Sequence, residues 1–340
     1  MFRRFRFTAS SHSLGHAPLA AVAFVLVAAA VLALATAPGA RASCGSESCP
    51  LDKASLWDES QLSFELTEQY IDQDQPRIGT SDALVGAISS QEDEVRTVNR
   101  ITTAHAAYRP NGAWAFSAAL PFVNRTHEHI HNQLGVPEYQ RWTYANVGDL
   151  EALAVRRFGA GPNARRTYFM SAGFKAPTGV TEVEEVDGDQ PEPPARPGTG
   201  SWDVLAGLGA EWMVRGPSLA GDMPLRVGVS GRWNGRGTEN YQVGAELTAH
   251  VGTELPLSHA ASVLLQTNLR IKAKDDVGDS DSEAGNTGGT AVYLSPGLKF
   301  SFGRQLSLYG LVQFPVYQRV NGIQIVSDSN LYFGVSRAIL

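Results

Sequence analysis

An alternating stretch between Ala261 and Lys274 constrains the fold more than any other part of the chain. Its odd-numbered residues are mainly apolar, and its even-numbered residues are mainly polar or basic. Because side chains on a β-strand point to opposite faces with a period of two, the segment offers one apolar face and one polar face. Roughly ten residues of such alternation let a tilted strand cross a bilayer with lipid on one face and water on the other. The stretch therefore predicts a transmembrane β-strand.

The first 42 residues have the features of an export signal. Three arginines stand among the first six residues, residues 19–35 are almost uninterruptedly apolar, and Ala40-Arg41-Ala42 offers small residues at the positions that a signal peptidase recognises. We expect residues 1–42 to be a cleaved signal peptide and the mature chain to begin at Ser43. A retained transmembrane helix and lipidation of Cys44 are the alternatives.

The composition of the remaining chain suits one large barrel or two ordinary domains. The full sequence has 43% hydrophobic and 18% charged residues and a net charge of -6. These bulk values resemble those of a soluble protein, as they do in outer-membrane barrels, because half of every strand is polar. The mature chain lacks a basic cluster with interleaved aromatic residues, which argues against nucleic acid as a partner.

Both cysteines lie close together after the predicted cleavage site. In an exported protein such a pair, here Cys44 and Cys49, most often closes a small disulfide loop. We assign residues 43–60 to a short periplasmic segment that carries this loop. The segment is too short for the folded plug of a TonB-dependent transporter.

Alternating stretches bounded by turn residues predict about twelve strands. They lie near 61–72, 94–108, 113–124, 147–158, 166–176, 201–213, 224–234, 240–252, 261–274, 290–302, 304–316 and 329–340. Short and long connections alternate, except near 234–239. In bacterial outer-membrane barrels the short turns face the periplasm, the long loops face outside, and the strand number is even. Residues 61–340 are thus expected to form an all-β, antiparallel up-and-down transmembrane barrel.

Aromatic residues on the predicted apolar faces support a barrel over a soluble β-sandwich. They stand near strand ends, where the two interfaces of a membrane attract aromatic rings. A sandwich core would not predict that clustering. The residues concerned are Trp114, Phe122, Tyr168, Phe174, Trp202, Trp212, Trp233, Tyr241, Phe302 and Phe314.

Several short strings resemble a known family of barrels. They are KAPTG at 175–179, PGTGSWD at 197–203, YLSPG at 293–297 and VQFPVYQRVNG at 312–322, with Gly148-Asp149 opening a strand. From about residue 60 onward the chain resembles the bacterial outer-membrane barrels known as meta-pathway phenol-degradation-like transporters. The resemblance implies a monomer-sized channel that admits small hydrophobic or aromatic compounds.

Positive charge gathers on the predicted inward faces. A barrel of about twelve strands lies between eight-stranded barrels, which side chains fill, and sixteen-stranded ones, which hold an aqueous pore. A narrow basic passage favours anions; alternatively, the charges pair with one another and fill the lumen. The expected lumen and selectivity residues are Arg96, Arg100, Lys175, Arg226, Arg232, Arg270, Lys272, Lys274 and Lys299, facing Glu151, Glu211 and Glu246.

The string HEHIH at 127–131 suggests a metal site in a predicted outer loop. On an extended segment His127, His129 and His131 share one face at steps of about 7 Å. Neighbouring imidazoles are suitable ligands for Zn²⁺ or Cu²⁺. Solvated loop histidines without a metal are the alternative, since the sequence identifies no fourth ligand.

These features favour transport over catalysis. The mature chain has neither the His-x-Ser pair of barrel acyl hydrolases nor a GxSxG elbow, so we do not expect an enzyme. The leading hypothesis is an outer-membrane channel for small aromatic or anionic solutes, with outer-membrane lipid and the barrel-assembly machinery as further partners. The alternative is a non-conducting structural barrel whose outer loops bind a metal or a protein partner.

Overall fold

The computed structural model describes residues 61–88, 92–132, 136–159, 165–183, 191–216, 221–280, 283–303 and 305–339. The predicted signal peptide, the segment 43–60 and the Cys44/Cys49 pair lie outside these residues. Within the described ranges, no helix combines the length and the apolar character needed to cross a membrane.

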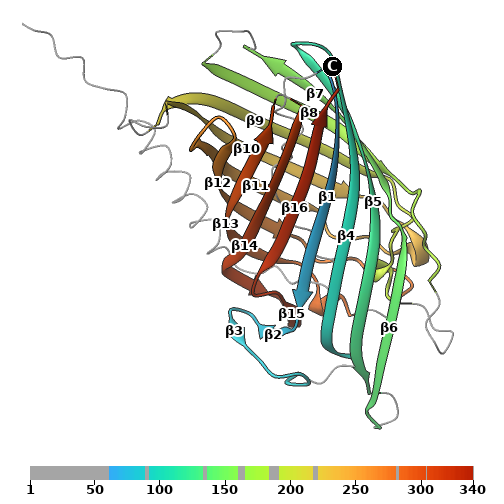
Figure 1. Cartoon of the computed structure of the whole chain (residues 1–340). Coiled ribbons are helices and arrows are strands. Elements are labelled where there is room, and N and C mark those ends of the chain that lie inside the picture. The colour runs from blue at the N-terminus through green and yellow to red at the C-terminus, as the bar shows by residue number, and fades with distance from the viewer. Residues whose placement is uncertain are drawn as a thin grey trace, which may run out of the picture. The chain divides into compact units, whose positions relative to one another are not determined.

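Antiparallel strands form a closed barrel, as the sequence predicts (Figure 1). Two of them, β6 and β7, follow one another along β5 and together occupy one of twelve strand positions. The strands are β1 Leu62–Gln73, β4 Glu92–Asn111, β5 Trp114–His131, β6 Glu138–Val147, β7 Leu150–Phe158, β8 Arg166–Ala176, β9 Asp203–Arg215, β10 Asp222–Asn234, β11 Glu246–Pro256, β12 Ala261–Lys272, β13 Gly289–Phe302, β14 Leu306–Val320 and β16 Asn330–Ala338.

The first and last strands close the barrel. Strand β1 pairs with β16 from Ser63–Ala338 to Ile71–Asn330, and its other edge pairs with β4. Both ends of the barrel chain lie with the short turns, whereas the long connections gather at the opposite end. There β2 (Gln75–Ile78), β3 (Ser81–Asp82) and β15 (Ile323–Val326) form a small sheet, at the lower end of the barrel in Figure 1.

An apolar band on the outer surface marks the part of the barrel that lipid covers. On β5 the outward residues are apolar from Trp114 to Phe122, and from Asn124 onward they are mainly polar. Nine residues of a tilted strand rise roughly 20 Å, close to the apolar band of about 25 Å in such barrels. The membrane-spanning part of β5 therefore ends near Phe122, and the rest of the strand projects beyond the bilayer.

The aromatic girdles follow the prediction, with one exception. Eight of the predicted rings are exposed on the outer surface: Trp114, Phe122, Tyr168, Phe174, Trp202, Trp233, Phe302 and Phe314. Trp212 also points outward and is half-buried. Tyr241 is wrongly assigned, because it is buried after the short 3₁₀ turn Thr238–Asn240 and donates a hydrogen bond to Asp275.

Two strand boundaries differ from those expected. The segment 125–146, which the sequence predicts to be a loop, contains the last seven residues of β5 and all but the last residue of β6. Outside the membrane an outward face need not be apolar for a strand to continue. The segment 240–252, which the sequence predicts to be one strand, contains a strand only from Glu246 onward. The connection 235–245 is consequently long, and the alternation of short and long connections has no exception there.

Candidate functional site

The interior of the barrel carries paired charges. Six of the predicted lumen cations face inward, and each has a carboxylate partner. The pairs are Lys175 with Asp149 and Asp203, Arg226 with Glu211, Arg232 with Glu151, Arg270 with Glu246, Lys272 with Asp275, and Lys299 with Glu254. Lys274 is exposed beyond the end of β12. The interior is thus charge-balanced rather than strongly basic, and the role of these residues in selectivity stays a prediction.

Two predicted lumen residues lie on the outer surface instead. The odd-numbered residues of β4, such as Thr97 and Asn99, are buried inside, so Arg96 and Arg100 face outward. Arg96 forms an ion pair of 2.6 Å with Asp72, and the Arg100 guanidinium lies 5.6 Å from the centre of the Tyr70 ring. The prediction was wrong because this half of β4 rises above the apolar band, where hydrophobicity no longer distinguishes the two faces.

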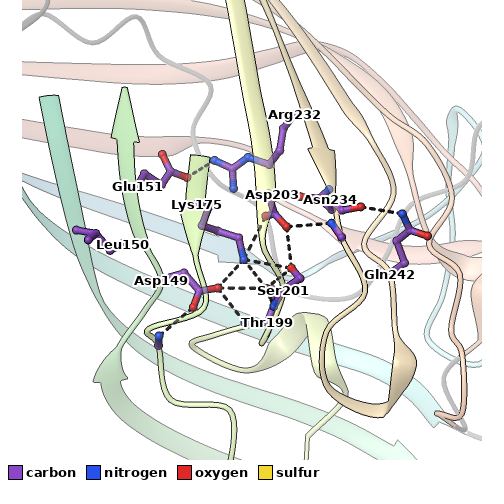
Figure 2. Close-up of polar contacts among 12 residues, drawn as sticks. Asp149, Leu150, Glu151, Lys175, Thr199, Ser201, Asp203, Arg232, Asn234 and Gln242 are labelled. Carbon is purple, nitrogen blue, oxygen red and sulfur yellow. Dashed lines mark hydrogen bonds and ion pairs between the residues drawn. The ribbon is translucent and has the colours of Figure 1, made fainter. Parts of the chain in front are cut away.

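Lys175 is the centre of a buried polar cluster at the long-connection end of β7, β8 and β9 (Figure 2). Its ammonium nitrogen lies 2.6 Å from Asp149 Oδ2 and 3.1 Å from Asp203 Oδ2. It also donates to the Thr199 hydroxyl, while Ser201 Oγ donates to Asp203 Oδ1 at 2.7 Å. The three charged side chains are at most 5% exposed. This arrangement balances a buried cation with two carboxylates.

The same cluster fixes the loop that follows β8. Asp149 Oδ1 accepts a hydrogen bond of 2.9 Å from the Gly179 amide, and its Oδ2 accepts one of 3.0 Å from the Thr199 amide. Glycine is needed at Gly179 and Gly198, because a Cβ on either would lie less than 3 Å from the backbone of the other. Three of the family-like strings, Gly148-Asp149, KAPTG and PGTGSWD, therefore form one structural unit that ties both ends of the loop to the barrel.

A cavity of about 420 Å³ lies inside the barrel. Part of its lining is polar, with Glu151, Arg232 and Glu246 among the residues (Figure 2 shows the Arg232–Glu151 pair). Arg232 on β10 reaches Glu151 on β7 across the two intervening strands, β9 and β8. Apolar side chains make up another part of the lining: Ile101, Val123, Leu153, Val155, Phe169 and Leu205.

The predicted histidine cluster lies on the C-terminal part of β5, beyond the apolar band. The three histidines share the inward face as expected, but they stand on a strand and not in a loop. His127 Nδ1 lies 2.7 Å from Thr97 Oγ1, its Nε2 lies 3.3 Å from Glu94 Oε2, and its ring centre lies 5.2 Å from that of His129. Among the described residues, no group of three or more His, Cys, Asp or Glu side chains is arranged to hold a metal ion.

His127 should make the stability of the barrel depend on pH. It stands five residues beyond the apolar band, and burial, together with the positive charges of His129 and Arg125, holds its pKa well below 6.5. Below about pH 6.5 the unfolded chain therefore binds a proton that the folded barrel excludes, so stability falls as the pH falls. The slope contributed is at most about 1.4 kcal/mol per pH unit.

We expect His127→Gln to flatten this dependence between pH 7 and pH 5. Denaturant midpoints of the refolded barrel, measured at both pH values, report the change. His259→Gln on the exposed turn after β11 is the matched control and should keep the wild-type slope. Identical slopes for wild type and His127→Gln would assign the acid sensitivity to other groups.

Comparison with known proteins supports the fold. No protein-family model and no curated protein matches the chain. An outer-membrane channel from Pseudomonas putida F1 has a TM-score of 0.61 and 11% identity, covering 89% of this chain and 100% of that chain. The transport unit of the autotransporter AIDA-I from Escherichia coli has a TM-score of 0.50 and 11% identity, covering 87% and 95%. The chain has an outer-membrane barrel fold. With its apolar band, this fold places the protein in the outer membrane.

Sequence reasoning did not find all of this interior. The acidic partners Asp149, Asp203 and Glu254 were not recognised, although each stands within or next to a predicted strand. The apolar part of the cavity lining was missed because its residues point into a lumen that was expected to be polar. Leu153 and Val155 alternate in step with Glu151, which was expected to face inward. This pattern could have indicated apolar side chains inside the barrel.

Proposed function

We propose that the protein is a channel that carries small solutes across the outer membrane. The observation that supports this most directly is the 420 Å³ cavity inside a closed barrel, a volume within the range of sites for small molecules. The likeness of the fold to a channel from Pseudomonas putida F1 agrees with the proposal.

We further propose that the preferred solute is small and aromatic, with one polar group. The apolar part of the cavity lining, which includes Phe169, suits a ring, and the polar part supplies hydrogen-bonding groups. An anionic solute that binds to Arg232 or Arg270 would have to displace the carboxylate already paired with that guanidinium group. The resemblance to the phenol-degradation-like transporters points to the same class, so we favour neutral aromatic solutes over the anions.

Planar-bilayer recording and proteoliposome swelling test the proposal. Purified protein should give discrete conductance steps, and phenol should enter proteoliposomes faster than benzoate of nearly the same size. Protein-free liposomes measure the direct permeation of both solutes through lipid. An absence of conductance and of solute flux above that background would favour the alternative, a structural or partner-binding barrel.

Neutralising one interior carboxylate should change the charge selectivity of this channel. Glu246 lines the cavity and accepts a hydrogen bond of 2.9 Å from Arg270. In Glu246→Gln the guanidinium charge is no longer balanced, so the reversal potential in a salt gradient should shift toward anions. Glu283→Gln, in the connection after β12, is a control that removes the same charge away from the cavity. Equal reversal potentials for the two variants would show that Glu246 does not border the ion path.

A further inference from the structure

The segment 191–197, here called the strap, reaches across the long-connection end of the barrel. The carbonyl of Ala195 accepts hydrogen bonds from the Arg125 guanidinium on β5 and the Tyr144 hydroxyl on β6. Arg196, the next residue, forms an ion pair with Glu239 in the connection between β10 and β11. The strap therefore contacts two parts of the rim that are separated by β7, β8 and β9.

The strap packs on side chains that also line the interior cavity. Ala195 packs in a buried cluster with Val123, Trp142 and Tyr144, and Ile101 packs against this cluster. Val123 and Ile101 also line the cavity. The apolar cluster under Ala195 therefore continues into the apolar part of the cavity lining through Val123 and Ile101.

The sequence of the strap suits a stiff flap. Four of its seven residues are proline, and Pro193, Pro194 and Ala195 are buried in a 3₁₀ turn. Proline has a fixed φ and no backbone N–H, so the segment keeps its shape, and its prolines have no amide donors to satisfy when it moves.

The strap is held in two different ways, one at the residues that follow it and one at Ala195. Its base continues into Gly198 and Thr199, whose amides donate to the Val180 carbonyl at 2.8 Å and to Asp149 Oδ2 at 3.0 Å, beside Lys175. Ala195, here called the tip, contacts β5 and β6 through the side-chain donors Arg125 and Tyr144 and through apolar packing. The base is built into the barrel wall, so movement belongs to the tip.

We propose that the strap is a gate, held shut by the Arg125 and Tyr144 hydrogen bonds to Ala195, that controls passage from outside into the cavity. This inference rests on the proposed channel function for its role, but the movement of the strap is measurable without it. The occupant that opens the gate is a solute able to compete for the apolar cluster beneath Ala195.

Labelling of a single cysteine beneath the strap tests the gate. Ser171 lines the cavity. If the strap is a gate, a membrane-impermeant maleimide added outside reaches the thiol of Ser171→Cys only when the strap is open. In intact cells this thiol should react up to about tenfold faster when Tyr144→Phe and Arg125→Met are combined, because lost hydrogen bonds favour the open form. The same background without Ser171→Cys corrects for labelling at Cys44 and Cys49.

Matched controls lie on β6, the strand that carries Tyr144. Tyr139→Phe and Arg141→Met alter an exposed tyrosine and an outward arginine of β6, so labelling should stay at the wild-type rate. Equal rates in the released and control variants would overturn the gate. If the double variant does not reach the folded, heat-modifiable form, the labelling rate of Tyr144→Phe alone tests the gate, because this variant keeps the ring and removes only the hydroxyl.

Conductance of the same variants separates the gate from the channel. Higher mean conductance of the released barrel together with faster labelling supports both. If labelling becomes faster but no variant conducts, the gate proposal is supported and the channel proposal is rejected. Conductance that is the same in all variants, with unchanged labelling, keeps the channel and rejects the gate.

Discussion

Replacing Lys175 with methionine is expected to lower the free energy of unfolding by about 3–5 kcal/mol, the loss typical of a buried ion pair that loses one partner. Methionine fills a similar volume but leaves Asp149 and Asp203 buried without their cation. Denaturant unfolding of the barrel refolded in lipid vesicles, followed by tryptophan fluorescence, gives the value.

Two further variants define the cause of that loss. Lys299→Met breaks a pair with Glu254 that water reaches more freely, with side chains 30% and 19% exposed, so the loss should stay below about 1 kcal/mol. Adding Asp149→Asn and Asp203→Asn to Lys175→Met removes the buried charges and should recover part of the stability. Equal losses for Lys175→Met and Lys299→Met would mean that the cluster is no more important than an ordinary lumen pair.

Arginine at position 265 should also destabilise the barrel strongly. Leu265 is 45% exposed on the outward face of β12, halfway along the strand, where lipid covers it. An arginine at the midplane of such a barrel costs roughly 2–4 kcal/mol. Leu265→Arg should therefore lower the free energy of unfolding by about that amount, measured by the same denaturant titration.

The neighbouring residue provides the control for this prediction. Gln266 faces the interior, so Gln266→Arg places the same charge at the same height among polar groups. We expect a clearly smaller loss for this variant. Indistinguishable midpoints for the two arginine variants would contradict the assignment of the outward and inward faces of β12.

The sequence predicts the fold well where lipid imposes a pattern. Within the bilayer an outward residue must be apolar, so parity along β8 and β12 could be determined directly from alternation. Above the apolar band this constraint ends, which is why Arg96 and Arg100 were placed on the wrong face and the strand segment 125–131 was taken for a loop. The errors share one cause, the loss of contrast outside the membrane.

The site was less predictable because its partners are distant in sequence. Lys175 was expected to offer a free charge, but Asp149 and Asp203 reach it from the neighbouring strand position and from the far end of a loop. The alternation of apolar and polar residues along a strand predicts which face of the sheet a side chain occupies, but it does not predict which side chains of other strands or loops it contacts. The strap contact between Ala195 and Tyr144 likewise joins residues 51 positions apart.

The pairing of β1 with β16 has a consequence for how the barrel folds. The edge of the first strand finds its partner only in the last strand, from Ser63–Ala338 to Ile71–Asn330. Contacts over such a separation form slowly, and until they form, two open edges expose unpaired N–H and C=O groups that a bilayer cannot satisfy. Insertion and closure are therefore coupled. The earliest strand to be exported must wait for the latest, and the chain stays dependent on chaperones throughout that interval.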